Sequence, residues 1–281
     1  MAANVNPMQV AAERFDNALD RAEFRRAAHC AGVELYRAHI VRHAFEPHTH
    51  EAFGLGAIET GTERFRYRGA DHLAPRDSLV MMNPDELHTG RAETEGGWRY
   101  RMIYVERAAL ERVAGDSGWW FADAVRDRAV TARRVGMLLD ELWRTTEPLA
   151  FDSLLQLLLD EFRAHARIGR AAKAEAAPRF APVIDYLRAH LARRITLDEL
   201  AAVAGLSPFH FLRSFKAQHH ATPQKMLMAL RLYEAKRLLA GGTPPAQVAA
   251  ATGLVDQAHL TRAFLRRYGV TPARYRQQVR G

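Results

Sequence analysis

The sequence has little of several features that define whole classes of proteins. Cys30 is the only cysteine among the 281 residues, so no disulfide can form within the chain, and a reducing compartment is expected. No run of 18 apolar residues is present, and the N-terminal segment lacks the apolar core of a secretory signal. These absences argue against a secreted or membrane protein, and we expect a soluble cytoplasmic one.

Acidic residues are scarce in the C-terminal part of the chain. Residues 179–281 hold 16 lysine and arginine residues against 5 acidic ones, whereas residues 1–178 hold 24 against 27. A basic region beside a mildly acidic one indicates that a polyanion binds one half only. A generally basic composition would give a similar count, so the charge alone does not decide.

The basic part contains one pattern written twice, at residues 195–223 and 244–272. The two copies share a histidine, an arginine, a phenylalanine and a Thr-Pro pair at a constant spacing of 49 residues. In each copy a short alanine-rich segment ends at a glycine, and a second segment follows a serine or aspartate. This is the pattern of a helix-turn-helix, so two such units on one chain make duplex DNA the leading partner.

Local signals predict where the helices of the first copy begin and end. Thr196 and Glu199 have the spacing of a capping box that opens the first helix. Gly205 can end it in a left-handed conformation, and Ser207 can cap the second helix. Gly253 takes the place of Gly205 in the second copy, and the turn that follows it is one residue longer.

The second helix of each copy presents an outer face suited to a DNA groove. In the first copy, Phe209 and Leu212 can touch a thymine methyl but cannot hydrogen-bond a base edge. In the second copy, Gln257 and Thr261 can bond base edges directly, so we expect the sharper specificity there. The residues expected at the DNA are Ser207, Phe209, His210, Leu212, Arg213 and Lys216, then Gln257, Ala258, Thr261 and Arg262. Either arginine could read a base or only contact a phosphate.

The stretch between the copies predicts one helix of about 18 residues. At 1.5 Å per residue this helix spans about 27 Å. Such a spacer could set the two recognition helices near one DNA turn apart, about 34 Å.

The segment from about Phe180 to Gln278 resembles the DNA-binding domain of the AraC/XylS family of bacterial transcription regulators. The phrase AAATGLVDQAHLTRAFLRRYGVTPARYR at residues 249–276 carries the resemblance. The family implies two recognition helices in successive faces of the major groove. Carried over by motif position, the reading residues are Phe209, Leu212 and Arg213 in the first copy and Gln257, Ala258, Thr261 and Arg262 in the second.

The chain before residue 180 has a different character. A short helix is expected over Val10–Ala28. Short apolar runs then fill residues 32–106 at a spacing of roughly ten residues, which predicts the strands of a sandwich or barrel. Residues 107–166 predict a helical hairpin interrupted at Pro148. Its second helix is so rich in leucine that it needs partners on two sides, either within one chain or from a second subunit.

Residues 44–69 and 75–90 resemble the effector-binding cupin domain of the same family. The resemblance implies a small β-barrel whose mouth holds a small ligand, followed by helices that dimerise. Arg64, Arg66 and Arg68 alternate with Phe65 and Tyr67, and Arg99 and Arg101 flank Tyr100. If either arginine row points into the barrel, an anionic effector follows. The alternative is a solvated outer face with Phe65 and Tyr67 lining the interior.

Three histidines are candidates for the ligand site. His48 and His50 point to one face of a strand because they stand two residues apart, and His88 comes from a later strand. Such a set can bind a metal, but metal-binding cupins usually carry a glutamate where this chain has Gly54 and Leu55. Hydrogen bonding to an organic effector, a structural role and a bound metal all stay open. We adopt the first, and expect no metal and no cofactor.

The predicted fold is multidomain α+β, with a cupin-like β-barrel and helical hairpin before an all-α domain of two helix-turn-helix motifs joined by a long helix. The expected units are an arm (1–29), an effector domain (30–107), a helical dimerisation segment (108–167), a linker (168–179) and a DNA-binding domain (180–281).

The predicted function is that of a sequence-specific transcription regulator that responds to a small-molecule effector in the barrel. The expected partners are operator duplex DNA, the effector and a second subunit, with RNA polymerase as a further contact and no membrane. The alternative is a cupin-type metal-dependent enzyme fused to a DNA-tethering domain, but no catalytic acid–base pair is evident. An alkyl-transfer repair protein would need more cysteines, and a constitutive DNA-bending protein would need no effector.

Overall fold

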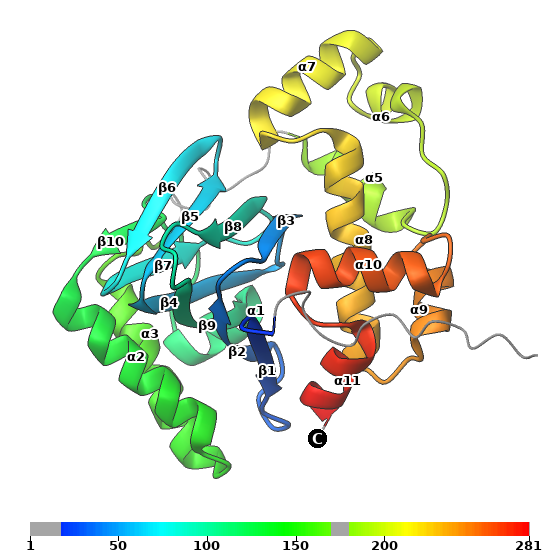
Figure 1. Ribbon diagram of the computed structural model, residues 1–281. Helices are drawn as coiled ribbons and strands as arrows, with labels where there is room; N and C mark the ends of the chain where they lie inside the picture. The colour runs from blue at the N-terminus through cyan, green and yellow to red at the C-terminus, as the bar shows by residue number, and fades with distance from the viewer. Residues whose placement is uncertain (1–17, 170–179, 281) are drawn as a thin grey trace, which may run out of the picture.

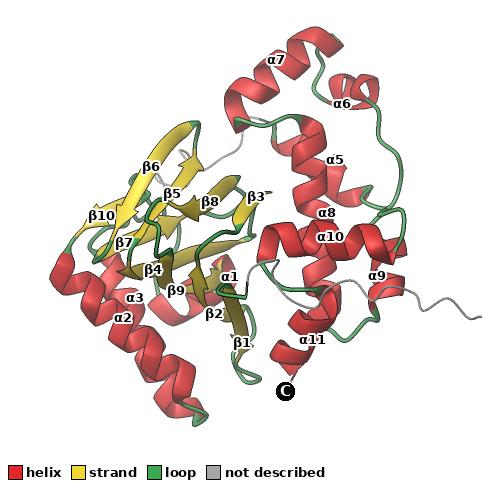
Figure 2. Cartoon of the chain, viewed as in Figure 1, coloured by secondary structure: helices red, strands yellow, loops and turns green. Residues whose placement is uncertain are grey.

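The computed structural model describes residues 18–169 and 180–280. Figure 1 places the strands on one side of the molecule and the C-terminal helices on the other, in direct contact. Most of the expected linker, residues 170–179, lies outside the described residues. The multidomain α+β architecture predicted from the sequence is confirmed, and Figure 2 shows that regular structure beyond residue 180 is entirely helical.

Two antiparallel sheets form the N-terminal barrel. The larger sheet has the order β1-β2-β9-β4-β7-β10, and the smaller has the order β3-β8-β5-β6. The strands of the larger sheet are β1 (Arg21–Arg26), β2 (Val33–Ile40), β4 (Ala52–Thr60), β7 (Ser78–Met82), β9 (Trp98–Glu106) and β10 (Val125–Asp127). Those of the smaller sheet are β3 (Ala44–His48), β5 (Thr62–Tyr67), β6 (Ala70–Pro75) and β8 (His88–Ala92). Large side chains from both sheets meet between them and form the barrel core.

The helix expected over Val10–Ala28 is wrong where the structure describes it, because β1 occupies Arg21–Arg26. Within this segment Ala22 and Phe24 are buried, which is the period of two that a strand requires. Backbone pairing with β2 along the whole strand and a ring contact between Phe24 and Tyr36 at 4.5 Å override the local helix propensity.

The helical hairpin predicted after the barrel is present. It follows α1 (Arg107–Ala114) and consists of α2 (Ala129–Arg144) and α3 (Pro148–Arg163), with Pro148 opening the second helix. α2 packs against the outer side of the larger sheet, and the inner face of α3 packs against α2 and α1 in the same apolar cluster. Leu157 on its outer face is 49% exposed, so this chain alone covers only part of the leucine-rich surface.

Seven helices make up the C-terminal part that the structure describes. They are α5 (Ala181–Ala189), α6 (Leu197–Val203), α7 (Pro208–His219), α8 (Pro223–Ala240), α9 (Pro245–Ala251), α10 (Gln257–Tyr268) and α11 (Pro272–Arg280). We call α6 and α7 the first head, and α9 and α10 the second head. The long connecting helix predicted between them is α8, at 18 residues.

The predicted helix ends of both heads are confirmed. Thr196 and Glu199 form the reciprocal capping box of α6. Gly205 and Gly253 adopt φ values of 64° and 68°, the left-handed region that ends a helix at low cost in glycine. Ser207 caps α7 as the sequence predicted. None of the helices in the described part has the length and apolar character needed to cross a membrane.

The two heads are anchored in different cores. Phe211 and Phe215 of α7 belong to a cluster made almost wholly of residues from α5 to α8. Leu260 and Phe264 of α10 belong instead to a cluster that continues into the barrel core through residues such as Phe24. The second head and the barrel therefore share one hydrophobic core, while the first head has its own.

Candidate functional site

The recognition helix of the first head, α7, turns an apolar face to solvent. Phe209 is 71% exposed, and Leu212 beside it is half-buried. Arg213 and Lys216 are exposed on the same helix, and neither forms a salt bridge with another described residue. Ser207 is occupied as the cap, since its Oγ accepts a hydrogen bond from the backbone N–H of His210. His210 itself is exposed.

The recognition helix of the second head, α10, turns a polar face to solvent. Gln257, Ala258 and Arg262 are exposed, and within the described ranges Arg262 forms no ion pair. The hydroxyl of Thr261 donates to the backbone oxygen of Gln257 at 2.9 Å. Its proton is therefore engaged, and toward a base edge Thr261 can only accept. Asp256 caps the helix by accepting from the N–H of His259 at 2.6 Å.

The other end of α10 lies on the barrel, where the structure adds contacts that the sequence reasoning missed. Arg267 donates to the backbone oxygen of Pro47 at 3.0 Å and to the carboxylate of Glu46 at 3.1 Å. Tyr268 is buried over the barrel mouth, with its ring 6.1 Å from that of His48. One helix thus offers one end to solvent and lays the other on the ligand domain (Figure 1).

A buried ion pair joins α8 to the barrel. The Lys236 ammonium bonds the Glu34 carboxylate of β2, and both side chains are 8% exposed. The hydroxyl of Tyr275 on α11 donates to the same carboxylate at 2.6 Å. Burial lowers the pKa of Lys236, while the Glu34 charge opposes that shift. Removing one partner would leave a charge buried without compensation.

The first head is held to the barrel by a looser set of contacts. Arg188 of α5 donates to Glu51 at 3.1 Å and to Asp85 at 2.6 Å, and all three side chains are partly exposed. A cavity of about 400 Å³ lies between barrel and first head, lined in part by Trp120 and Met226. This attachment is polar and open to water, so it is weaker than the shared core of the second head.

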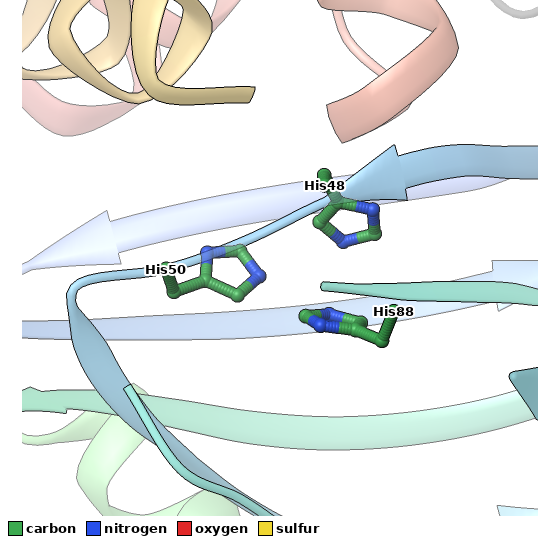
Figure 3. A group of neighbouring side chains, drawn as sticks. All are labelled: His48, His50 and His88. Atoms are coloured by element: carbon green, nitrogen blue, oxygen red, sulfur yellow. The ribbon is translucent and has the colours of Figure 1, made fainter. Parts of the chain in front are cut away.

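The structure brings the three predicted histidines together inside the barrel (Figure 3). One ring nitrogen from each of His48, His50 and His88 lies within 4.8 Å of those of the other two, and all three residues are buried. His48 and His88 face each other across β3 and β8, with ring centroids 4.2 Å apart. The three rings thus come together as expected, but β3 ends at His48 and His50 lies in the loop that follows, so strand parity alone does not account for the shared face.

The environment keeps these imidazoles neutral. Burial lowers the pKa of His88 to about 4 and the pKa values of His48 and His50 well below their usual range. His48 Nδ1 lies 2.8 Å from the backbone oxygen of Glu46, and His88 Nδ1 lies 3.1 Å from that of Glu86. In a neutral ring a nitrogen facing a carbonyl carries the proton, so Nε2 of both rings bears the lone pair.

The barrel cavity around the histidines is small, about 40 Å³, because aromatic rings fill the rest. Tyr268 and Arg267 of α10 line it together with Glu63 of β5. Burial raises the pKa of Glu63 to about 8, so this carboxyl is largely protonated at neutral pH. A signal for Glu63 was present in the sequence, since it shares strand parity with the inward Phe65 and Tyr67.

The arginine rows lie outside the barrel. Phe65 and Tyr67 are buried in the core. Arg64 pairs with Glu93 and Arg68 with Glu86, all on the outer side of the smaller sheet. The interpretation of a solvated outer face holds, and the anionic effector that inward arginines would have implied has no support from them.

Comparisons with known proteins agree with this architecture. Residues 31–175 match the family model for the AraC-like ligand binding domain, and residues 200–278 match a helix-turn-helix domain. The chain is 28% identical over 238 residues to YbfI, an uncharacterized HTH-type transcriptional regulator of Bacillus subtilis, covering 81% of this chain and 86% of that protein. It is 38% identical over 96 residues to the MmsAB operon regulatory protein of Pseudomonas aeruginosa, covering 34% of this chain and 31% of that protein.

Solved structures share the whole arrangement. The crystal structure of unsaturated fatty acid bound ToxT from Vibrio cholerae aligns over 93% of this chain and 98% of its own, with a TM-score of 0.57 and 10% sequence identity. At that identity the likeness shows the fold alone. The match to the AraC-like ligand binding domain covers more than half of the sequence. The chain therefore belongs to the AraC/XylS family of bacterial transcription regulators, as a DNA-binding protein whose N-terminal domain binds a small-molecule effector.

Proposed function

We propose that the two heads read two chemically unlike half-sites of one operator. The observation that carries this proposal is the contrast between the exposed faces of α7 and α10. Phe209 and Leu212 offer apolar contact suited to thymine methyls, whereas Gln257 and Arg262 offer hydrogen bonds to base edges. The reading set comprises Ser207, Phe209, His210, Leu212, Arg213 and Lys216 in the first head, and Gln257, Ala258, Thr261 and Arg262 in the second.

Selection of bound duplexes from a random DNA pool by the full chain tests this proposal. The expected result is a bipartite sequence with centres about 10–10.5 base pairs apart, sharply defined in one half and thymine-rich in the other. The affinity for the selected duplex should fall steeply with salt concentration, because lysine and arginine displace counterions from the phosphates. A salt slope near zero would reject DNA binding, and two equally sharp halves would reject unlike reading.

We further propose that the effector acts on the second head through the barrel mouth. The space around His48, His50 and His88 is about 40 Å³, while organic ligands usually occupy cavities of about 300–1,000 Å³. A bulky effector can enter only if Tyr268 and Arg267 withdraw, which moves α10. Effector binding would then favour the position of the second head in which the mouth is open, by as much as the effector prefers that state.

We also propose an oligomeric state, a division into functional units and a cellular setting, from the family and from the exposed apolar residues of α2 and α3. The outer faces of α2 and α3 carry exposed apolar residues, with Val130 at 82% and Leu149 at 72% exposure, and we assign them to a homodimer contact. The functional units are the effector domain 30–107 together with β1 and β10 of the same sheet, the helical hairpin within 108–167, and the DNA-binding domain 180–281, which follows the linker 168–179. A regulator at a promoter acts in the cytoplasm at the nucleoid, with RNA polymerase as a further partner. We assign it no catalytic activity, because the relatives with which it was compared are transcription regulators.

A further inference from the structure

Three buried histidines at the barrel mouth have polar atoms that the described contacts leave without partners. Nε2 of His50 is fully buried and makes no hydrogen bond to any described residue. The hydroxyl of Tyr268, which lines the same cavity, is also buried and unbonded among the described residues. Leaving buried polar groups unbonded costs about 1–3 kcal/mol each, so their convergence on one small space indicates a ligand there.

We propose that His48, His50 and His88 bind one late first-row divalent transition-metal ion inside the barrel, beneath Tyr268. This assignment departs from the sequence-based expectation of no metal, which depended on a missing glutamate. The inference adds a bound ion to the closed barrel mouth, and this ion is separate from the bulky effector, which enters only when the mouth opens.

The surroundings of the rings suit metal ligation. Metal-bound histidines usually donate a hydrogen bond from their other ring nitrogen to a backbone carbonyl or carboxylate, which fixes the ring and its tautomer. His48 and His88 do so through Nδ1, to the carbonyls of Glu46 and Glu86. These hydrogen bonds fix both rings with the Nε2 lone pair free for an ion. The rings therefore hold this orientation before any ion binds.

The distances are compatible with one ion after a small contraction. Zinc bonds imidazole nitrogen at about 2.0–2.1 Å, which in tetrahedral geometry puts ligand nitrogens about 3.4 Å apart. The three nitrogens lie within 4.8 Å of one another. Each ring must therefore move by less than about 1 Å, which small side-chain rotations supply.

The size of the cavity selects the kind of ligand. About 40 Å³ accommodates an ion and a water or two, since one water occupies about 30 Å³ in the liquid. Three imidazoles without a carboxylate suit zinc, iron, cobalt, nickel or copper better than magnesium or calcium. The open coordination position would face Tyr268, whose hydroxyl could then bond an ion-bound water.

The positive charges nearby do not exclude a cation. Lys236 is neutralised by Glu34, and Arg267 by Glu46. The Arg267 pair ties α10 to the barrel and the Lys236 pair ties α8 to it, so an ion bound beneath Tyr268 would be enclosed by α10.

The test is a titration of the chelator-stripped full chain with Co²⁺ alone, followed by visible absorption and by the melting temperature. We expect one equivalent of tightly bound cobalt, an absorption band of low-coordinate cobalt, and a raised melting temperature, because the ion binds only the folded state. His88→Ala and His50→Gln should weaken binding by at least about 100-fold, since even outer-shell losses cost about 10–100-fold. His72→Ala, on β6 of the same sheet, removes a half-buried histidine whose ring stacks on Phe65 and which is not one of the three clustered histidines; it is the matched control and should bind like the wild type.

Two results would overturn the site: no stoichiometric cobalt on the wild type, or equal binding by wild type, His88→Ala and His50→Gln. If the variants fail to fold by circular dichroism, X-ray absorption of the cobalt-loaded wild type decides. Three imidazole ligands support the site, and fewer reject it. No step uses DNA, so failure of the operator proposal would leave this result unchanged, and the reverse also holds.

Discussion

The two heads of the DNA-binding domain share one sequence pattern but differ in how the rest of the molecule holds them. The first head packs on its own cluster around Phe211 and Phe215, and reaches the barrel through partly exposed ion pairs of Arg188. The second head shares a continuous core with the barrel and is tied to it by Arg267, and the buried pair of Lys236 and Glu34 ties the adjoining helix α8 to the barrel. The local sequence determines that each head folds as a helix-turn-helix. The contacts that each head makes with the rest of the molecule determine which of the two the barrel can control.

This difference assigns unlike tasks to the two copies. A unit that opens without disturbing the barrel can search DNA independently of the ligand state. A unit that shares the barrel core can respond to the barrel, because any ligand that prefers one position of α10 shifts its equilibrium. The polar, edge-reading face of Gln257 and Arg262 sits on the controlled unit.

The largest effect is expected from breaking the buried pair. Lys236→Met leaves the Glu34 carboxylate buried with the Tyr275 hydroxyl and a distant Arg26, and should lower the free energy of unfolding by about 3–5 kcal/mol. Denaturant unfolding measures the loss. Lys225→Met, the same exchange at an exposed site of α8, should change it by less than about 0.5 kcal/mol. Equal results for the two variants would contradict a buried tie, and Glu34→Gln added to Lys236→Met should restore most of the loss.

The next effect concerns base reading by the second head. Arg262→Ala should cost about 1–3 kcal/mol of operator affinity and relax the preference at one base pair. Binding to a panel of base-substituted operators measures both quantities. Arg237→Ala removes an exposed arginine outside the recognition helices and should leave the preference unchanged. A uniform loss with intact preference would mean that Arg262 only contacts phosphate.

A third prediction uses the protonated carboxyl in the barrel. The pKa of Glu63 is raised in the folded state to about 8 from about 4.5, so its contribution to stability is intact below pH 4.5 and is lost as the pH rises toward 8. Glu63→Gln removes this titration. Relative to wild type, the variant should gain about 3–4 kcal/mol between pH 5 and pH 8.

Thermal unfolding at both pH values measures this gain. The exposed exchange Glu95→Gln is the control and should shift the unfolding equally at both. A pH-independent difference for Glu63→Gln would show that the carboxyl is already ionised in the folded barrel. Because of the shared core, the gain should extend to the second head and leave the first head unchanged.

The smallest effect should arise at the first head. Replacing thymine by uracil in the half-site it reads removes one methyl per base, and should cost about 0.5–1 kcal/mol if Phe209 and Leu212 pack on it. Fluorescence anisotropy with wild type and Phe209→Ala measures the cost. The variant should no longer distinguish the two duplexes, and the same replacement in the other half-site should matter less. A persistent preference in Phe209→Ala would assign the reading to other residues.

Most of the helical domain could be predicted from the sequence because its signals are local. The capping box at Thr196, the glycine at Gly205 and the cap at Ser207 each act within four residues. The local sequence alone therefore determines these helix ends. The helix expected through residue 28 failed because the strand there depends on pairing with β2, eight or more residues away. Pairing between distant strands has a weaker signal in the local sequence than a helix cap has.

The candidate site could be predicted only in part for a similar reason. Strand parity placed His48 and His50 on one face, and parity could also have found Glu63. No spacing in the sequence predicts that Arg267 and Tyr268, more than 200 residues later, close the same cavity, because that contact depends on how two domains dock. The coupling between barrel and second head was therefore the part that required the structure.

The most direct test of the central claim, that the barrel holds the second head and not the first, is amide hydrogen exchange on the unliganded full chain. The account predicts that Gln257–Tyr268 of α10 exchanges as slowly as the barrel strand β9, and that Pro208–His219 of α7 exchanges through an opening of lower free energy. In the Lys236→Met variant, the amide exchange rate of α10 should rise to nearly that of α7. Equal protection of the two helices in the wild type, or faster exchange in α10 than in α7, would contradict it.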